Sequence, residues 1–190
     1  MLRRANRRAQ RLDVPVELAM RYRNPSIESA LSRLAVPGID ELLLIPLFPH
    51  YAMSSFETAV VRVREVAASL APRMRIEVQP PFYDHPDYIT ALAASAREYL
   101  ARDYDHLLFS FHGIPERHLR KSDPSGRHCL AAADCCETAN LAHATCYRAQ
   151  CFKTMHAFVA KAGVPANKFS YSFQSRLGKD PWLKPYTDFE

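Results

Sequence analysis

The feature that most constrains this chain is an apolar run, residues 107–111, that stops abruptly at His112-Gly113-Ile114-Pro115. A run of this length and composition is typical of a buried strand in an α/β sheet. Gly113 and Pro115 oppose its continuation, so we expect His112 where the strand ends and a loop begins. Ligands of open α/β sheets bind beyond the carboxyl ends of the strands, and imidazole exchanges a proton near neutral pH. His112 is therefore a candidate functional residue; a histidine hydrogen-bonded into a turn is the alternative.

Helical and strand-like patterns alternate along the rest of the chain. Apolar residues recur at helical spacing around residues 27–34, 56–70, 86–103 and 152–162. Short apolar or alternating runs that indicate strands occupy residues 41–46, 75–79 and 169–174. Ser54 and Glu57 have the spacing of a capping box that opens the second helix. Alternation of this kind predicts an α/β fold with mostly parallel strands covered by helices.

Composition is typical of a soluble globular protein. With 190 residues, of which 48% are hydrophobic, the chain can bury a substantial core. No apolar run approaches the roughly 18 to 20 residues that span a bilayer. Arginines interrupt the N-terminus where a signal peptide would be apolar. We therefore expect a cytoplasmic protein.

The net charge of +5 is concentrated at the N-terminus, where residues 1–12 hold five arginines and no acidic residue. A nucleic-acid-binding protein would spread basic residues over a docking face, so this distribution does not indicate nucleic acid as a partner. The arginine run is typical of a solvated helix face. A weak, peripheral attraction to an anionic membrane surface is the alternative.

Five blocks of sequence carry a family resemblance. They are residues 47–51, 81–84, 110–117, 173–178 and 180–188. Together, in this order and spacing, they closely resemble the ferrochelatases, which insert ferrous iron into protoporphyrin. The resemblance implies a chelatase-type α/β fold of two similar Rossmann-like domains with parallel sheets, and protoporphyrin IX and Fe²⁺ as substrates. A chelatase for another metal or tetrapyrrole is the near alternative, and a metal-cluster-bound interaction module from a truncated gene is the distant one.

The resemblance also sets the expected domain organisation. Residues 1–85 correspond to part of an N-terminal α/β domain, 86–103 to a linking helix, and 104–190 to part of a second α/β domain with a Cys-rich insertion at 129–151. The family's usual opening has no counterpart before Met1, so we interpret the chain as an interior fragment. The family pairs its active-site histidine with a glutamate further along than Glu190, and we expect the fragment alone to be inactive.

By resemblance, His112 matches the family's active-site histidine. An imidazole can accept pyrrole protons or transiently ligate iron, and the sequence leaves both roles open. Tyr83 matches a position that lines the porphyrin, which an aromatic face and a hydroxyl suit; a tyrosine packed at a strand-to-helix turn is an equal alternative. His50 also ends an apolar strand and is interpreted as a structural histidine. Arg176 and Trp182 are interpreted as residues that shape the porphyrin cleft.

All five cysteines lie within residues 129–151. A cytosolic setting argues against disulfides, and large apolar side chains are scarce between Cys136 and Cys146, so a metal centre would supply the missing cross-link. Spacing does not separate zinc from an iron–sulfur cluster, and unrelated free thiols are the third alternative. Resemblance to bacterial ferrochelatases with an insertion here implies a [2Fe–2S] cluster with a structural or regulatory role. The predicted ligands are Cys129, Cys136, Cys146 and Cys151, with Cys135 as the spare.

Overall fold

The computed structural model describes residues 14–189. The chain divides into two compact units: the described part of Met1–Leu47 with Ser54–Pro80, and Phe48–Met53 with the described part of Pro81–Glu190. The arginine run that was expected to form a solvated helix face lies outside the described residues. Among residues 14–189, no helix is both long and apolar enough to cross a membrane.

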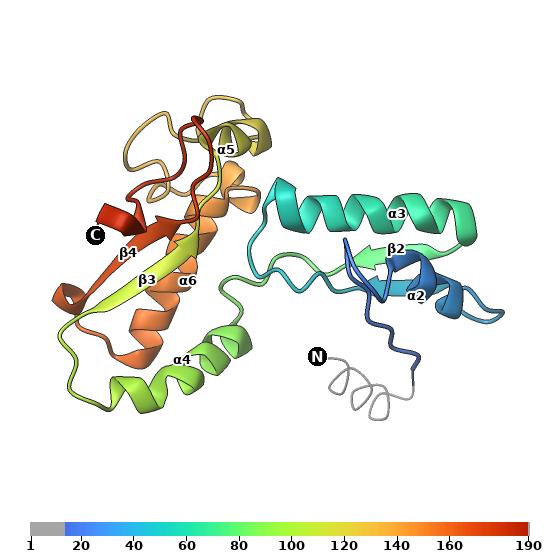
Figure 1. Ribbon diagram of the computed structural model, residues 1–190, viewed down its shortest axis with the longest axis horizontal. Helices are drawn as coiled ribbons and strands as arrows, with labels where there is room; N and C mark the ends of the chain where they lie inside the picture. Colours follow the sequence, from blue (N-terminus) through green and yellow to red (C-terminus); the bar gives the residue numbers. More distant parts are fainter. Residues whose placement is uncertain (1–13, 190) are drawn as a thin grey trace. The chain divides into compact units, whose positions relative to one another are not determined.

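The first unit packs two helices on a two-stranded parallel sheet (Figure 1). Its elements are α2 (Ile27–Leu34), β1 (Glu41–Leu44), α3 (Thr58–Leu70) and β2 (Arg75–Val78). The strands pair in register from Glu41↔Arg75 to Leu44↔Val78. Apolar side chains of both helices meet those of both strands in one core, formed by Ile27, Leu31, Val63, Val66 and Ala67 with Leu42, Leu44, Met74 and Ile76. Because side chains alternate along a strand, Leu43 and Ile45 are exposed on the opposite face.

The entry into α3 differs from the sequence expectation. A π-helical segment, η1 (Met53–Glu57), runs directly into the helix. The N-cap residue Glu57 has helical dihedral angles and makes no side-chain capping hydrogen bond. The capping box predicted from Ser54 and Glu57 is therefore wrong, because a serine cap requires an extended residue at the helix start and the backbone here is already helical.

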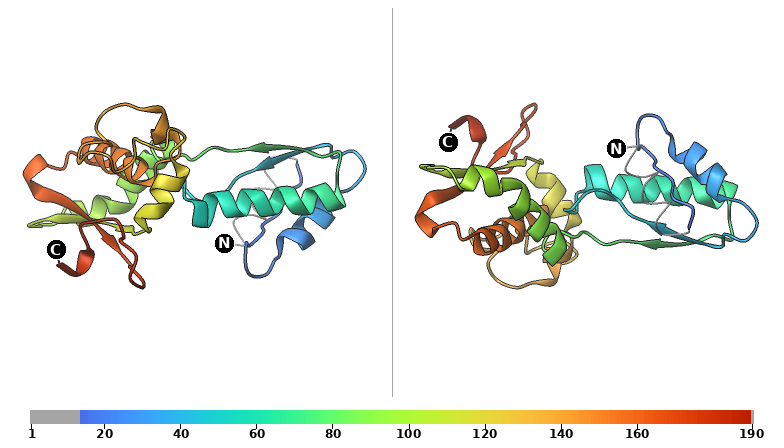
Figure 2. Two further views of the ribbon diagram at one scale, coloured as in Figure 1. Left: turned by 90° about the horizontal axis from the view of Figure 1, so that it is seen from above. Right: turned by 90° about the horizontal axis from the view of Figure 1, so that it is seen from below.

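The second unit is built around the parallel strands β3 (Leu107–His112) and β4 (Phe169–Gln174). Two long helices, α4 (Pro86–Leu100) and α6 (Tyr147–Ala162), lie on one side of this pair (Figure 2). The remaining segments are short: α5 (Glu116–Ser122), η2 (Leu141–Ala144), η3 (Ala166–Lys168) and η4 (Thr187–Phe189). The register runs from Leu107↔Phe169 to His112↔Gln174, so the two strands end at the same level.

Local sequence explains the limits of the two long helices. Pro86 occupies the first turn of α4, where its missing N–H costs nothing, and His85 caps the helix by accepting the N–H of Asp87 at 3.3 Å. Gly163 ends α6 in the left-handed conformation, with φ of 69°. The α/β class with parallel strands is confirmed. The predicted domain limits stay a prediction, and α4, the predicted linking helix, packs against α6.

Candidate active site and cysteine cluster

His112 is the last residue of β3, and its side chain is exposed. The next residue, Gly113, donates its N–H to the carbonyl of Gln174 at 2.7 Å, which joins the two strand ends. A Cβ atom at Gly113 would lie 2.8 Å from that carbonyl oxygen, closer than such atoms approach in proteins. Glycine is therefore required at this turn. The turn places the His112 imidazole at the carboxyl edge of the sheet, where α/β proteins bind ligands.

Trp182 and Arg176 brace the loops beside this edge. Trp182 forms an isolated β-bridge with Pro115, and its indole N–H donates to the carbonyl of Leu177 at 2.9 Å. Arg176 pairs with the carboxylate of Asp188 at 2.8 Å. Both side chains thus make contacts within the scaffold of the second unit.

His50 belongs to a polar network inside the second unit. Its Nε2 lies 2.8 Å from Oγ1 of Thr154, whose hydroxyl donates to the carbonyl of Tyr83 at 2.7 Å. Since that hydroxyl has one proton, His50 is the donor in the first bond. Burial lowers the pKa of His50 to about 4, which keeps the imidazole neutral at pH 7. His50 therefore connects residues 48–53 to α6 as a neutral hydrogen-bond donor.

Tyr83, the predicted porphyrin-lining residue, is half-buried. Its carbonyl is held by Thr154, and the ammonium of Lys153 lies 5.6 Å from the centre of its ring. An aromatic surface beside a positive charge is the result. Among the described residues, no hydrogen bond or ring contact joins Tyr83 to His112 directly.

A tyrosine that was not predicted as a site residue contacts the backbone of His112. Tyr147 is the first residue of α6, and its hydroxyl donates to the His112 carbonyl at 2.9 Å. Its ring meets the ring of His50 edge-on, with 5.7 Å between the ring centres. The hydroxyl also hydrogen-bonds with the thiol of Cys151, and burial raises the pKa of Tyr147 above its usual range. No sequence signal marks this residue, because folding alone brings it to the end of β3.

Four of the five cysteines gather around Cys146, the N-cap residue of α6; we call them the Cys146 group. The thiol of Cys146 hydrogen-bonds with those of Cys136 and Cys129, and the bond from Cys136 lowers the pKa of Cys146 to about 6. Burial, reinforced by Cys146, raises the pKa of Cys129 to about 12. Cys135 interacts electrostatically with Cys129 and Cys136, and its sulfur accepts the N–H of Leu130 at 3.4 Å.

Cys151 makes different contacts from the Cys146 group. It is fully buried on α6, and its thiol hydrogen-bonds with the hydroxyl of Tyr147. Burial raises its pKa well above the usual range, with a smaller contribution from Cys146. Of the four predicted ligands, Cys151 is thus the one outside the Cys146 group, and Cys135, the predicted spare, is inside it.

A buried carboxylate, that of Asp123, organises the start of residues 123–146, which we call the Cys-rich segment. Asp123 accepts hydrogen bonds from the N–H and hydroxyl of Ser125 at 2.9 and 2.8 Å. It also accepts the N–H groups of His128 and Cys129 at 2.7 and 2.9 Å. The bond from Cys129 is the largest cause that lowers the pKa of Asp123 far below its usual range. The carboxylate therefore acts in its ionised form.

Two further pairs of hydrogen bonds close the segment. Ser122 and Thr145, at its two ends, each donate a hydroxyl proton to the other's carbonyl, at 3.1 and 2.6 Å. Inside it, the Nε2 atoms of His128 and His143 both lie at hydrogen-bond distance from the carbonyl of Cys135, at 2.8 and 3.0 Å. Both rings must donate through Nε2, because a carbonyl can only accept.

The donor set of the Cys146 group fits a soft metal centre. The thiols of Cys129, Cys135 and Cys146 are buried and that of Cys136 is half-buried, and sulfur donors of this kind suit zinc or an iron–sulfur cluster. Within residues 14–189, however, no three His, Cys, Asp or Glu side chains converge as they would around a metal ion. The described residues thus provide suitable ligands close together and not a preformed coordination geometry.

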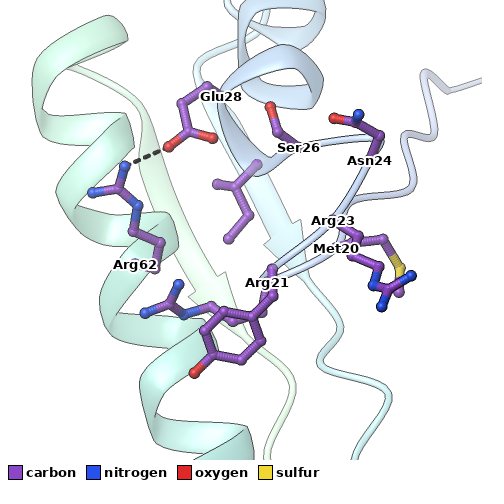
Figure 3. A pocket seen from close by; sticks show the side chains of 9 residues that line it. Met20, Arg21, Arg23, Asn24, Ser26, Glu28 and Arg62 are labelled. Carbon is purple, nitrogen blue, oxygen red and sulfur yellow. Dashed lines mark hydrogen bonds and ion pairs between the residues drawn. The ribbon is translucent and has the colours of Figure 1, made fainter.

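The first unit contains a pocket that the sequence did not indicate as a site (Figure 3). Its volume is about 330 Å³, and its lining residues are Met20, Arg21, Tyr22, Arg23, Asn24, Ser26, Ile27, Glu28 and Arg62. Arg62 is ion-paired with Glu28, as Figure 3 shows. The Nε of Arg21 donates to the carbonyl of Thr58 at 3.2 Å. The lining has three arginines and one glutamate, so its net charge is positive. In the sequence, the only indication of this pocket was the pair of arginines on either side of Tyr22.

The parallel strands of the second unit, with an exposed histidine at the carboxyl end and a turn that requires glycine, are typical of an α/β protein with a ligand site at the sheet edge. Comparison with known proteins gives the family. The sequence model of the ferrochelatase family, described as Ferrochelatase, matches residues 1–190. The chain belongs to the ferrochelatase family.

Individual relatives agree with this assignment. A ferrochelatase of Opitutus terrae is 54% identical over 178 residues, which are 94% of this chain and 52% of the relative. One of Pseudomonas entomophila is 52% identical over 175 residues, covering 92% of this chain and 52% of the relative. One of Pseudomonas fluorescens SBW25 is 50% identical over 181 residues, with 95% and 53% covered. The chain spans about half the length of the curated relatives it matches.

Proposed function

We propose that this chain supplies the histidine-bearing part of a ferrochelatase active site, which inserts Fe²⁺ into protoporphyrin IX. The observation that carries the proposal is the exposed imidazole of His112 at the carboxyl end of β3, on a turn fixed by Gly113. Insertion forms four iron–nitrogen bonds and releases two pyrrole N–H protons. An imidazole near neutral pH can accept such a proton or transiently ligate the entering iron.

Tyr83 is the proposed porphyrin contact. The half-buried ring offers an aromatic face for the macrocycle, and the ammonium of Lys153 lies 5.6 Å from the ring centre. A cation at that distance suits a ligand with carboxylate side chains. The family membership supports a porphyrin as the substrate, since relatives of this chain carry the name ferrochelatase.

A chimaera tests the role of His112 whether or not this chain acts alone. In it, the chain replaces the matching half of the Opitutus terrae relative, and anaerobic Fe²⁺ insertion is followed by the shift of the porphyrin absorption band. His112→Ala should lower the rate by more than tenfold, about 1.4 kcal/mol of barrier. His106→Ala is the matched control, because His106 lies just before the same strand at its other end and bonds to Ser170.

The control should keep its full rate. A His112→Ala chimaera that binds porphyrin and inserts iron within threefold of the parent rate would reject the proposed role. Parallel assays with other divalent metals would show whether iron is the preferred substrate.

We also propose that the cysteines bind a [2Fe–2S] cluster that supports the fold of the second unit. Cys129, Cys136 and Cys146 are three predicted ligands that lie together and largely buried. For the fourth, the contacts favour Cys135, because the Cys151 thiol already bonds to Tyr147. When bound, such a cluster would cross-link the segment through four thiolates and add to the apolar packing of Cys129, Ala142 and Cys146.

Spectroscopy of anaerobically purified chain tests the cluster. A [2Fe–2S] centre should give visible charge-transfer bands and an EPR signal after reduction, and elemental analysis separates it from zinc. Serine at Cys129, Cys136 or Cys146 should bleach the bands. The matched pair is Cys135→Ser, which should bleach them, and Cys151→Ser, which should not. If Cys151→Ser bleaches the bands and Cys135→Ser does not, the ligand set predicted from sequence is correct. If all five serine variants keep their full metal content, or if all five lose it, a site of four cysteines is rejected.

A further inference from the structure

The hydrogen bond from Tyr147 to His112 joins two elements that are distant in sequence. Tyr147 opens α6 and His112 ends β3, 35 residues earlier, and the phenol hydroxyl lies 2.9 Å from the His112 carbonyl oxygen. This carbonyl belongs to the peptide between His112 and Gly113. The N–H of the same peptide donates to Gln174 at 2.7 Å. Both polar atoms of that peptide are therefore held, one by β4 and one by Tyr147.

The phenol is itself held in place. Its proton goes to the His112 carbonyl, so the oxygen is free to accept from the thiol of Cys151, one turn further along α6. The ring packs edge-on against His50, whose other edge contact is Phe111, the neighbour of His112 in β3, at 6.0 Å. His50 is fixed in turn by Thr154.

We propose that Tyr147 is a positioning residue for His112 and that Cys151 acts by orienting the Tyr147 hydroxyl. A peptide plane held at both ends fixes the backbone dihedral ψ of His112, and the direction of the Cα–Cβ bond follows from it. The fixed backbone restricts the rotamers open to the exposed imidazole at the sheet edge. An exposed side chain at a strand end would otherwise sample several rotamers, which would weaken a reaction that depends on the orientation of the acceptor.

The proposal rests on the proposed function only for the catalytic use of His112. The conformational part is testable in this chain by NMR with ¹³C-labelled histidine. Tyr147→Phe removes the hydroxyl and keeps the ring that packs on His50. The His112 ring signals should then shift and show rotamer averaging, and the Gly113 amide should exchange several times faster with solvent. Tyr104→Phe is the control, since its half-buried ring lies in the same unit and contacts Lys168.

Cys151 provides the second pair of variants. Cys151→Ser keeps a donor and should leave the His112 signals close to those of the parent chain, whereas Cys151→Ala should change them in the same direction as Tyr147→Phe. If Tyr147→Phe does not fold, this pair decides the question alone. Unchanged His112 signals in both Tyr147→Phe and Cys151→Ala would overturn the proposal.

In the chimaera with the Opitutus terrae relative, Tyr147→Phe should lower kcat for iron insertion about tenfold and change the porphyrin KM less than twofold. A structural role alone would instead lower the amount of folded enzyme and leave its kcat unchanged. A full rate in the His112→Ala chimaera would reject the proposed function while the NMR signals still decide the positioning role. The two failures are therefore distinguishable.

Discussion

The end of β3 and the Cys-rich segment at residues 123–146 lie in the same unit, but different kinds of interaction hold them. At the end of β3, backbone hydrogen bonds set the conformation, and the close approach of Gly113 to the Gln174 carbonyl leaves no room for a larger residue. In the Cys-rich segment, side chains do so, chiefly the carboxylate of Asp123 and the hydroxyl pair of Ser122 and Thr145. The first region depends on the shape of the chain, and the second depends on the ionisation state of a few groups.

The largest expected loss of stability follows from a substitution at the end of β3. Gly113→Ala places a methyl group 2.8 Å from the Gln174 carbonyl, so the strand ends must separate. We expect a loss of about 3 kcal/mol in the free energy of unfolding, measured by urea denaturation. The matched control is Gly126→Ala in the Cys-rich segment, where φ is +65° and no atom lies within 4 Å of the new group.

The control should cost about 1 kcal/mol, from backbone strain alone. Equal losses in the two glycine variants would mean that the β3 end is no more tightly constrained than a solvent-exposed turn.

A smaller effect should follow from Asp123→Asn. The amide would direct hydrogens at N–H groups that now donate to the carboxylate, and we expect a loss of about 2 kcal/mol at pH 7. The pKa of Asp123 is lowered in the folded chain, so its contribution is complete above about pH 4 and is lost as the pH falls through the folded pKa. Denaturation curves at several pH values should therefore show an acid slope that Asp123→Asn reduces.

Asp134→Asn is the matched control for that slope, because Asp134 is exposed in the same segment. It should retain the acid dependence of the parent chain. An unchanged slope in Asp123→Asn would show that the carboxylate does not organise the segment.

The smallest expected effect concerns His50, beside the end of β3. Burial lowers its pKa to about 4 in the folded chain, whereas an unfolded histidine titrates near 6.5. Between these values the unfolded state binds more protons, so stability is complete above about pH 6.5 and falls by about 1 to 2 kcal/mol as the pH decreases to about 5. His50→Gln keeps a donor for Thr154 and should remove this dependence. A slope of the same size in the variant would place the titrating group elsewhere.

The two regions also differ in how far sequence could predict them. The apolar run, Gly113 and Pro115 act on neighbouring backbone, so the strand and the position of His112 at its end followed from local pattern. The contact from Tyr147 could not be predicted from local pattern, since it depends on where α6 starts relative to β3.

A local pattern can also mislead. The spacing of Ser54 and Glu57 matched a capping box, but the chain continues as helix through η1 instead.

The cysteines show the same limit. Of the adjacent pair, Cys136 was predicted to be a ligand and Cys135 the spare, and local pattern offered no contact by which to compare them. In the folded segment Leu130 adopts φ of 63°, and its N–H donates to the sulfur of Cys135 beside the other thiols. Irregular backbone of this kind is set by hydrogen bonds to Asp123 and is not encoded in a periodic pattern.

The central claim is that the chemistry belongs to the end of β3 and the support to the cysteines. Its most direct test is the anaerobic Fe²⁺ insertion rate per folded molecule in the chimaera, with His112→Ala and Cys146→Ser compared side by side. We predict that His112→Ala lowers this rate by at least tenfold, while Cys146→Ser lowers the yield of folded protein and leaves the rate per folded molecule within threefold. A full rate in His112→Ala, or a loss per folded molecule in Cys146→Ser as large as that in His112→Ala, would contradict the claim.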